Sequence, residues 1–211
     1  MLALEFTILK MKKSSLILIF FPLFLMGQEP DFMLWSKASL NYSINKKTSI
    51  SFSQGLRLRE NASLKDELFS NFSISRKWNK RWRIAMDYRL IEEYDVFFNS
   101  ELQHRFSLDL RWRKKIDRLT IKSRSRFQYG SSLAFRERLS VHYNLPKTPL
   151  EPSFLLETFS DFSSVAKLRA TIGASYPLAK STDIDLYYRL QNNFDKASIV
   201  YILGLGISHD I

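Results

Sequence analysis

The sequence contains no cysteine. This excludes disulfide bonds, and it also excludes a lipid anchor attached to a cysteine at a signal-peptide cleavage site. Beyond the N-terminal region, no segment approaches the roughly 18 consecutive apolar residues that a transmembrane helix needs. The three histidines are scattered and form no metal site. We therefore expect no metal and no cofactor, and any attachment to a membrane must come from the fold itself.

Positive charge is in excess, because 32 lysines and arginines stand against 21 aspartates and glutamates, which gives a formal net charge of +11. Nucleic-acid binding requires such residues to form one patch. Here they recur at every second position through many strand-like segments, and the chain begins with an export signal. We therefore expect no nucleic-acid partner and favour a role at a membrane.

The N-terminal region has the features of a cleaved secretory signal peptide. A basic segment begins at Met11, and an apolar run extends from Leu16 to Met26, which is too short to span a bilayer as a helix. The predicted division of the chain is an upstream start-site extension over residues 1–10, a signal peptide over residues 11–27, and one β-barrel domain over residues 28–211. We expect the exported protein in the cell outer membrane.

A two-faced pattern recurs along the chain, and residues 102–112 show it most clearly. Their even positions form a nearly unbroken apolar row from Leu102 to Trp112, whereas their odd positions carry polar residues and charges of both signs. Alternation with period two predicts a β-strand whose two faces meet different surroundings. The apolar row has about the length that a tilted strand needs to cross a bilayer.

About eleven such segments follow one another, separated by short polar turns, and this spacing favours a meander. The predicted fold is all-β: an antiparallel up-and-down transmembrane β-barrel of about 10–12 strands. Because single-chain bacterial barrels have even strand numbers, we expect ten or twelve rather than eleven. The clustered prolines Pro146, Pro149 and Pro152 predict a break between two strands.

Alternation alone does not tell which face points inward, since a soluble barrel uses the same pattern with its apolar face inside. Ten or more strands enclose a space that one layer of leucines and isoleucines fills poorly, which favours an apolar exterior against lipid. A predicted interfacial girdle lies beside the short turns and comprises Tyr42, Trp78, Trp82, Trp112, Tyr143 and Tyr176. A periplasmic soluble β-barrel that acts as a binding protein is the alternative.

Several short pieces of the chain resemble a family of bacterial outer-membrane β-barrel proteins of unknown function from Gram-negative bacteria. They are Leu34-Trp35, residues 74–84, residues 135–139, Pro152 with Glu157, residues 167–169, residues 186–190 and residues 201–206. Together these pieces cover essentially the whole mature chain. The resemblance implies an outer-membrane barrel, with outer-membrane lipid and the barrel-assembly machinery as partners, and it implies no activity or catalytic residue.

Charged residues occupy the face opposite the apolar rows. The predicted lumen charges are Arg57, Arg89, Arg105, Arg124, Arg126, Arg136, Arg138, Arg169, Arg189, Glu67, Asp87, Glu101, Asp109 and Asp185. One interpretation is a rigid lattice of ion pairs that fills a narrow lumen. The other is a narrow pore that favours small anions, because arginines outnumber the carboxylates. We expect a monomer in either case.

Ser140 and His142 share a strand face, which raises the hypothesis of an outer-membrane hydrolase. Side chains two positions apart on a strand do not ordinarily reach hydrogen-bond geometry, and no acid on the same strand face orients the histidine. We therefore expect no catalytic residue and no enzymatic activity.

Overall fold

The computed structural model describes residues 31–161 and 164–211, so the predicted start-site extension and signal peptide lie outside the described residues. Eleven strands make up the described part of the chain. They are β1 (Asp31–Tyr42), β2 (Thr48–Arg59), β3 (Leu64–Lys77), β4 (Trp82–Tyr94), β5 (Ser100–Ile116), β6 (Leu119–Tyr129), β7 (Leu133–Tyr143), β8 (Glu151–Ser160), β9 (Val165–Ala179), β10 (Thr182–Asn193) and β11 (Ser198–Asp210).

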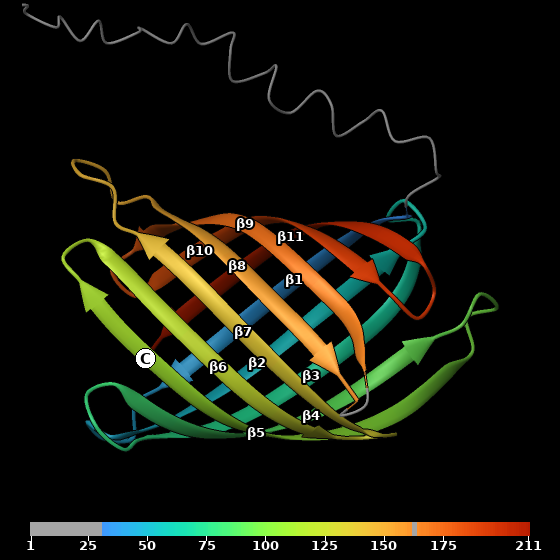
Figure 1. Ribbon diagram of the computed structural model, residues 1–211, viewed down its shortest axis with the longest axis horizontal. Coiled ribbons are helices and arrows are strands. Elements are labelled where there is room, and N and C mark those ends of the chain that lie inside the picture. The colour runs from blue at the N-terminus through green and yellow to red at the C-terminus, as the bar shows by residue number, and fades with distance from the viewer. Residues whose placement is uncertain (1–30, 162–163) are drawn as a thin grey trace, which may run out of the picture.

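The strands form one closed barrel (Figure 1). Each strand from β1 to β10 pairs in antiparallel fashion with the strand that follows it in the chain, as a meander requires. The last strand, β11, pairs with β1 in parallel, from Asp31 opposite Val200 to Asn41 opposite Asp210. The predicted all-β barrel is confirmed. The expectation of an even strand number was wrong, because one parallel pair closes an odd number of strands.

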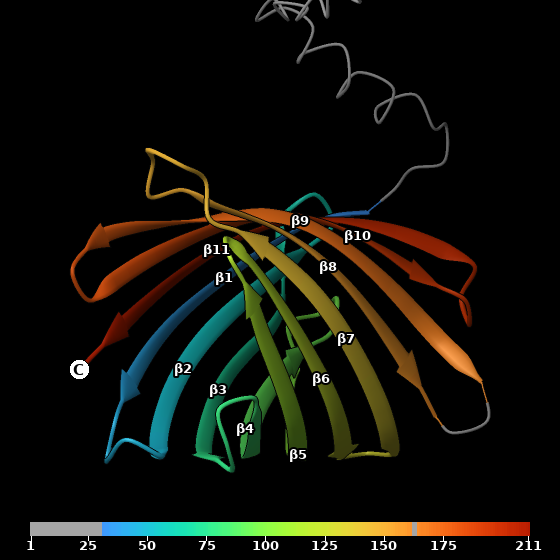
Figure 2. The same ribbon diagram turned by 60° about the vertical axis from the view of Figure 1, so that its left-hand side comes forward.

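The parallel pair places the first and last described strands side by side with the same direction (Figure 2). As a result Asp31 and Asp210 lie at opposite ends of the barrel. We call the end that carries the turns at residues 43–47, 78–81, 117–118, 144–150 and 180–181 the C-terminal end. The N-terminal end carries the loops at residues 60–63, 95–99, 130–132 and 194–197 and the connection from β8 to β9.

Large apolar side chains cover the outside of the barrel. Leu108 in the middle of β5 is 50% exposed and Met86 on β4 is 63% exposed. The same outward apolar positions recur on the other strands and include Leu40, Phe52, Phe72, Leu110, Phe127, Leu139, Phe154, Ile172, Leu186, Leu205 and Ile207. The described residues contain no helix that is long and apolar enough to cross a membrane. Polar residues interrupt the wall in places, for example where Ser125, Glu137 and Thr158 lie in register on neighbouring strands.

The break between β7 and β8 ends earlier in the chain than the three prolines predicted. Pro152 already lies inside β8 and pairs with Ala174 of β9. The ladder between β7 and β8 begins only at Ser153, opposite His142. At Pro152 the strand therefore has a partner on one side alone, so the missing proline N–H removes no bond to β7.

Candidate functional site

Two aspartates and two arginines form the centre of a charge lattice inside the barrel. Arg126 on β6 lies with Nη2 2.7 Å from Asp87 Oδ2, and its Nε donates to Asp109 Oδ1 at 2.5 Å. Arg111 on β5 donates from Nη2 to Asp109 Oδ2 at 2.6 Å. Asp109 is fully buried, with 0% exposure. A carboxylate without water is stable only when cations and hydrogen-bond donors surround it, as here.

Glu157 on β8 is the second centre of the lattice, and only 4% of its side chain is exposed. Its Oε1 lies 2.6 Å from Arg124 Nη2, 3.2 Å from Arg136 Nη2 and 3.1 Å from Arg138 Nη2. Its Oε2 lies 3.8 Å from Arg169 Nη1. One carboxylate thus compensates arginines from β6, β7 and β9, and it ties these neighbouring strands together on the lumen side of the wall.

Aromatic rings fill the space between these arginines toward the N-terminal end. Trp35 on β1 is buried, and the guanidinium of Arg57 stands 4.0 Å from its ring centroid. Arg89 lies 4.3 Å from the ring centroid of Phe69, and Arg169 lies 4.4 Å from that of Phe159. Stacked guanidinium groups are stabilised by the ring faces and lose less on leaving water than ammonium groups do. We call Trp35, Phe69 and Phe159, with the arginines stacked on them, the aromatic plug.

Two glycines make room for rings beside the aromatic plug. A Cβ at Gly55 would lie 2.4 Å from Phe69 Cζ, and a Cβ at Gly204 would lie 1.9 Å from Tyr187 Cζ. The rings therefore rest directly on the bare backbone of the neighbouring strand, and a side chain at either position would force the ring above it to move.

The other predicted lumen charges have varied surroundings. Arg57 and Glu67 form an ion pair, while Asp185 accepts a hydrogen bond from Ser175. Arg189 Nε donates to Thr171 Oγ1 at 2.8 Å, next to the plug. Arg105 is half-buried, whereas Glu101 lies near the N-terminal end of the barrel and is exposed.

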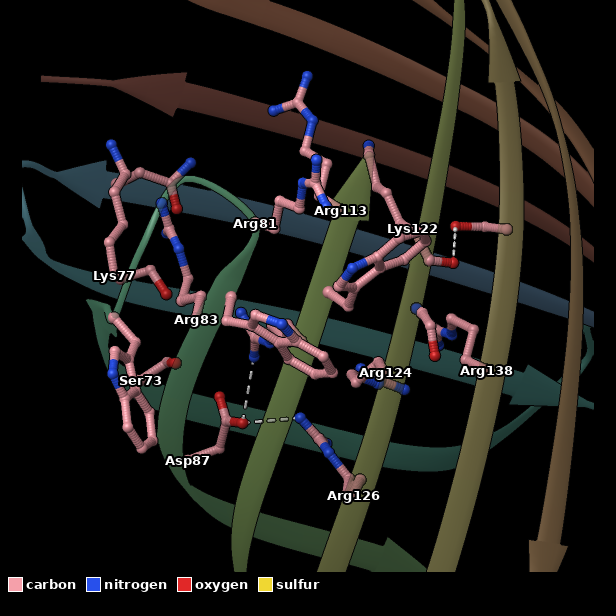
Figure 3. A pocket seen from close by; sticks show the side chains of 18 of the residues that line it. Ser73, Lys77, Arg81, Arg83, Asp87, Arg113, Lys122, Arg124, Arg126 and Arg138 are labelled. Atoms are coloured by element: carbon pink, nitrogen blue, oxygen red, sulfur yellow. Dashed lines mark hydrogen bonds and ion pairs between the residues drawn. The ribbon is translucent and has the colours of Figure 1, made fainter. Parts of the chain in front are cut away.

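Toward the C-terminal end the lumen widens into an open cavity of about 1170 Å³, which we call the vestibule. Its wall is strongly basic, as Figure 3 shows. The cationic residues that line it are Lys37, Lys46, Lys47, Lys77, Lys80, Arg81, Arg83, Arg89, Arg111, Arg113, Lys122, Arg124, Arg126 and Arg138. Among the described residues that line the vestibule, Asp87 supplies the carboxylate, and Arg126 and Arg111 already contact it.

A second cavity of about 360 Å³ lies between the vestibule and the aromatic plug. It shares Lys37, Arg124 and Arg138 with the vestibule, and Trp35 and Phe69 also line it. The accessible space thus narrows from the C-terminal end toward the plug.

The two ends of the barrel differ in charge as well. The C-terminal end carries a concentration of basic residues in or beside its turns: Lys46, Lys47, Lys77, Lys80, Arg81, Lys114, Lys115, Arg118, Lys147 and Lys180. The N-terminal end carries acidic residues: Asp31, Glu60, Asp66, Glu92, Glu93, Asp95, Glu101, Asp161 and Asp195. All residues of the predicted girdle, from Tyr42 to Tyr176, lie at or near the C-terminal end. Trp78 is 74% exposed there.

Ser140 and His142 both face the lumen but do not form a nucleophile–base pair. Ser140 is buried, and its Oγ donates to the carbonyl oxygen of Lys122 at 3.5 Å. His142 Nδ1 lies 3.1 Å from Glu151 Oε1 on the next strand, a neighbour that the pattern within one strand does not reveal.

The sequence-based set of lumen charges missed Glu157 and the aromatic plug. Glu157 sits in a strand where Leu155 and Leu156 obscure the alternation, although Leu155 lines both cavities. Trp35 and Tyr187 occupy the polar side of their strands in the sequence. Aromatic residues on the face that otherwise holds charged residues are the sequence signal from which aromatic rings inside the lumen could have been predicted.

Comparison with known proteins identifies the family of this chain. A family model described as "Protein of unknown function (DUF2490)" matches residues 32–201, which extend from the second residue of β1 into β11. No curated protein matches the sequence. The match covers the strands that build both the charge lattice and the vestibule, and on this basis the chain belongs to the DUF2490 family, whose function is unknown.

Proposed function

We propose that this protein is an integral outer-membrane β-barrel with a closed lumen and a structural role, rather than a wide channel. The observation that carries the proposal is the distribution of polarity: apolar side chains cover the outside, and the buried charges lie inside. A soluble barrel needs the reverse arrangement, whereas a barrel in lipid has an apolar exterior and a polar interior.

Strand length and the aromatic positions support the same proposal. The strands contain between 10 and 17 residues, and a tilted strand of about 9–11 residues spans a bilayer. Exposed aromatic residues gather at the C-terminal end, among them Trp78, Trp82 and Tyr143. Tyr129 and Phe194 are exposed toward the N-terminal end. Two such bands fit the two interfaces of a membrane.

Fractionation tests the location. We expect the mature protein to stay in the membrane pellet after a carbonate wash, and to migrate differently on gels before and after boiling, because a folded barrel resists detergent. A soluble protein released by the wash, with one mobility on gels, contradicts the membrane proposal and supports the periplasmic binding protein.

Substitution of a single outward residue tests which face meets lipid. Leu108→Arg places a charge on the outer wall at the middle of β5 and should lower the free energy of unfolding by about 2–4 kcal/mol in lipid vesicles. Ser51→Arg adds the same charge where Ser51 lines the vestibule, and we expect a much smaller loss. Denaturant titration of both variants measures the difference. Equal losses contradict the assignment of the two faces, and a larger loss from Ser51→Arg would mean that the faces are reversed.

A narrow anion-favouring pore is the second candidate, and the basic vestibule is the observation that favours it. For conduction, the path would have to continue past Trp35 and Phe69, where the second cavity meets the plug. We therefore rank a pore below a closed barrel. We further propose that the protein is a monomer without catalytic activity, and that Ser140 and His142 belong to the lumen wall.

A further inference from the structure

We propose that the vestibule is a binding site for a soluble, multiply charged phosphate-bearing anion that enters along the barrel axis from the C-terminal end. The proposal concerns the interior of the barrel, so it stands whether or not the outer wall lies in lipid. It also differs from a pore, because it requires binding without passage through the plug.

The first argument is uncompensated charge. Lys37, Lys122 and Arg113 line the vestibule, and among the described residues they have no ion pair and no side-chain hydrogen bond. In the lattice deeper in the lumen, by contrast, Glu157 and Asp109 each engage arginines directly. Cations left unpaired in a hollow with low-dielectric walls focus a positive potential, which concentrates anions there.

The second argument is the accessibility of Lys37 at the floor of the vestibule. Lys37 points into the lumen from β1, between Gly55 on β2 and Gly206 on β11, where the ring of Phe69 and the side chain of Asp185 lie over the two glycines. Lys37 nevertheless lines both cavities, and it is exposed although it faces inward. Its ammonium group is thus available to a ligand that reaches the floor.

The third argument concerns the number of charges on the ligand. The vestibule measures about 1170 Å³, and its cations are distributed over turns and strands from β1 to β7. A single phosphate is small compared with this volume and cannot contact cations on opposite walls. A ligand with several phosphate groups, either an inorganic polyphosphate or a phosphorylated sugar, matches both the size and the distribution.

The opening of the vestibule distinguishes this ligand from the lipids around the barrel. Its rim includes Lys46, Trp78 and Arg81 in the turns at the C-terminal end, so the cavity opens along the axis toward water. Lipids beside the barrel contact the outer wall instead. The ligand therefore arrives from the aqueous side.

Calorimetric titration of the folded mature protein in a neutral detergent with sodium tripolyphosphate tests the proposal. We expect saturable binding that weakens as salt is added, since salt screens the charges. The double variant Lys37→Ser/Lys122→Ser should bind about a hundredfold more weakly, because two charge-assisted contacts are lost and each is worth about a factor of ten. Lys37→Arg/Lys122→Arg, which retains both charges, should bind within about twofold of the wild type.

The matched control is Lys114→Ser/Lys115→Ser, which removes the same net charge near the turn between β5 and β6, outside the vestibule lining. It should leave the affinity within about twofold of the wild type. Equal weakening by both serine pairs, or absence of saturable binding in the wild type, overturns the proposal. A parallel titration with glucose 1,6-bisphosphate separates the two ligand sources: tighter binding of the bisphosphate indicates a phosphorylated sugar, and tighter binding of tripolyphosphate indicates a free polyphosphate.

Discussion

Glu157→Gln is expected to lower the free energy of unfolding by about 3–5 kcal/mol, the typical loss when one partner of a buried ion pair is removed. The glutamine keeps the shape of the side chain but not its charge. Arg124, Arg136 and Arg138 then repel one another around a neutral group, because Glu157 is the carboxylate that contacts them. Urea unfolding in lipid vesicles, followed by tryptophan fluorescence, measures the effect.

Glu137→Gln is the matched control, since it makes the same chemical change on the adjacent strand but on the outer wall. Glu137 pairs in register with Ser125 and Thr158, away from the arginines of the lattice. If the outer wall faces lipid, as proposed, removing a charge from it should leave stability unchanged or raise it slightly. If both glutamine variants lose the same small amount, below about 1 kcal/mol, Glu157 does not hold the lattice together.

Trp35→Ala is expected to turn a silent barrel into a conducting one. In planar bilayers the wild type should show no current if, as proposed, the plug closes the lumen between the second cavity and the N-terminal end. Trp35 contacts Arg57, Arg169 and Arg189 with its ring, so its removal leaves a void among guanidinium groups. Water enters such a polar void, and the currents should favour anions because the exposed groups are positive.

Trp78→Ala makes the same substitution in an exposed turn and should remain silent. The alanine at position 35 also destabilises the fold, by about 3–5 kcal/mol, so gel mobility before and after boiling must first show that the variant is folded. A folded Trp35→Ala protein without current shows that the closure lies elsewhere. Currents in the wild type that favour cations contradict both the closed barrel and the anion pore.

The sequence predicted the strands well because side-chain direction in a strand follows directly from parity. Leu186 and Arg189 fall on opposite faces of β10 simply because they are an odd number of positions apart. The strand number was harder to predict, since the rule of even numbers assumes that the last pair is antiparallel. The alternation in β1 and β11 is compatible with either direction, so the parallel closure leaves no trace in it.

Parity also predicted which charges face the lumen, including Arg126 and Asp109, but it did not predict their partners. Arg126 contacts Asp87 as well as Asp109, and which strands lie side by side, and in which register, decides such pairs. Glu157 was missed because Leu155 shares its inward face and breaks the polar pattern. The position of the vestibule depends on how much of the lumen the side chains fill at each height along the barrel axis. Period-two alternation predicts the direction of a side chain but not this filling.

The parallel pairing of β1 with β11 also has a consequence for the folding rate. All other neighbouring strands are joined by a short connection, so the sheet can grow hairpin by hairpin at a small cost in chain entropy. The final step joins Asp31 to Val200, which closes the longest loop in the described chain. Before that step the sheet has two open edges that are able to pair with another chain. We expect this closure to be the slow step of folding, and the seam between β1 and β11 to be where a destabilised barrel first opens.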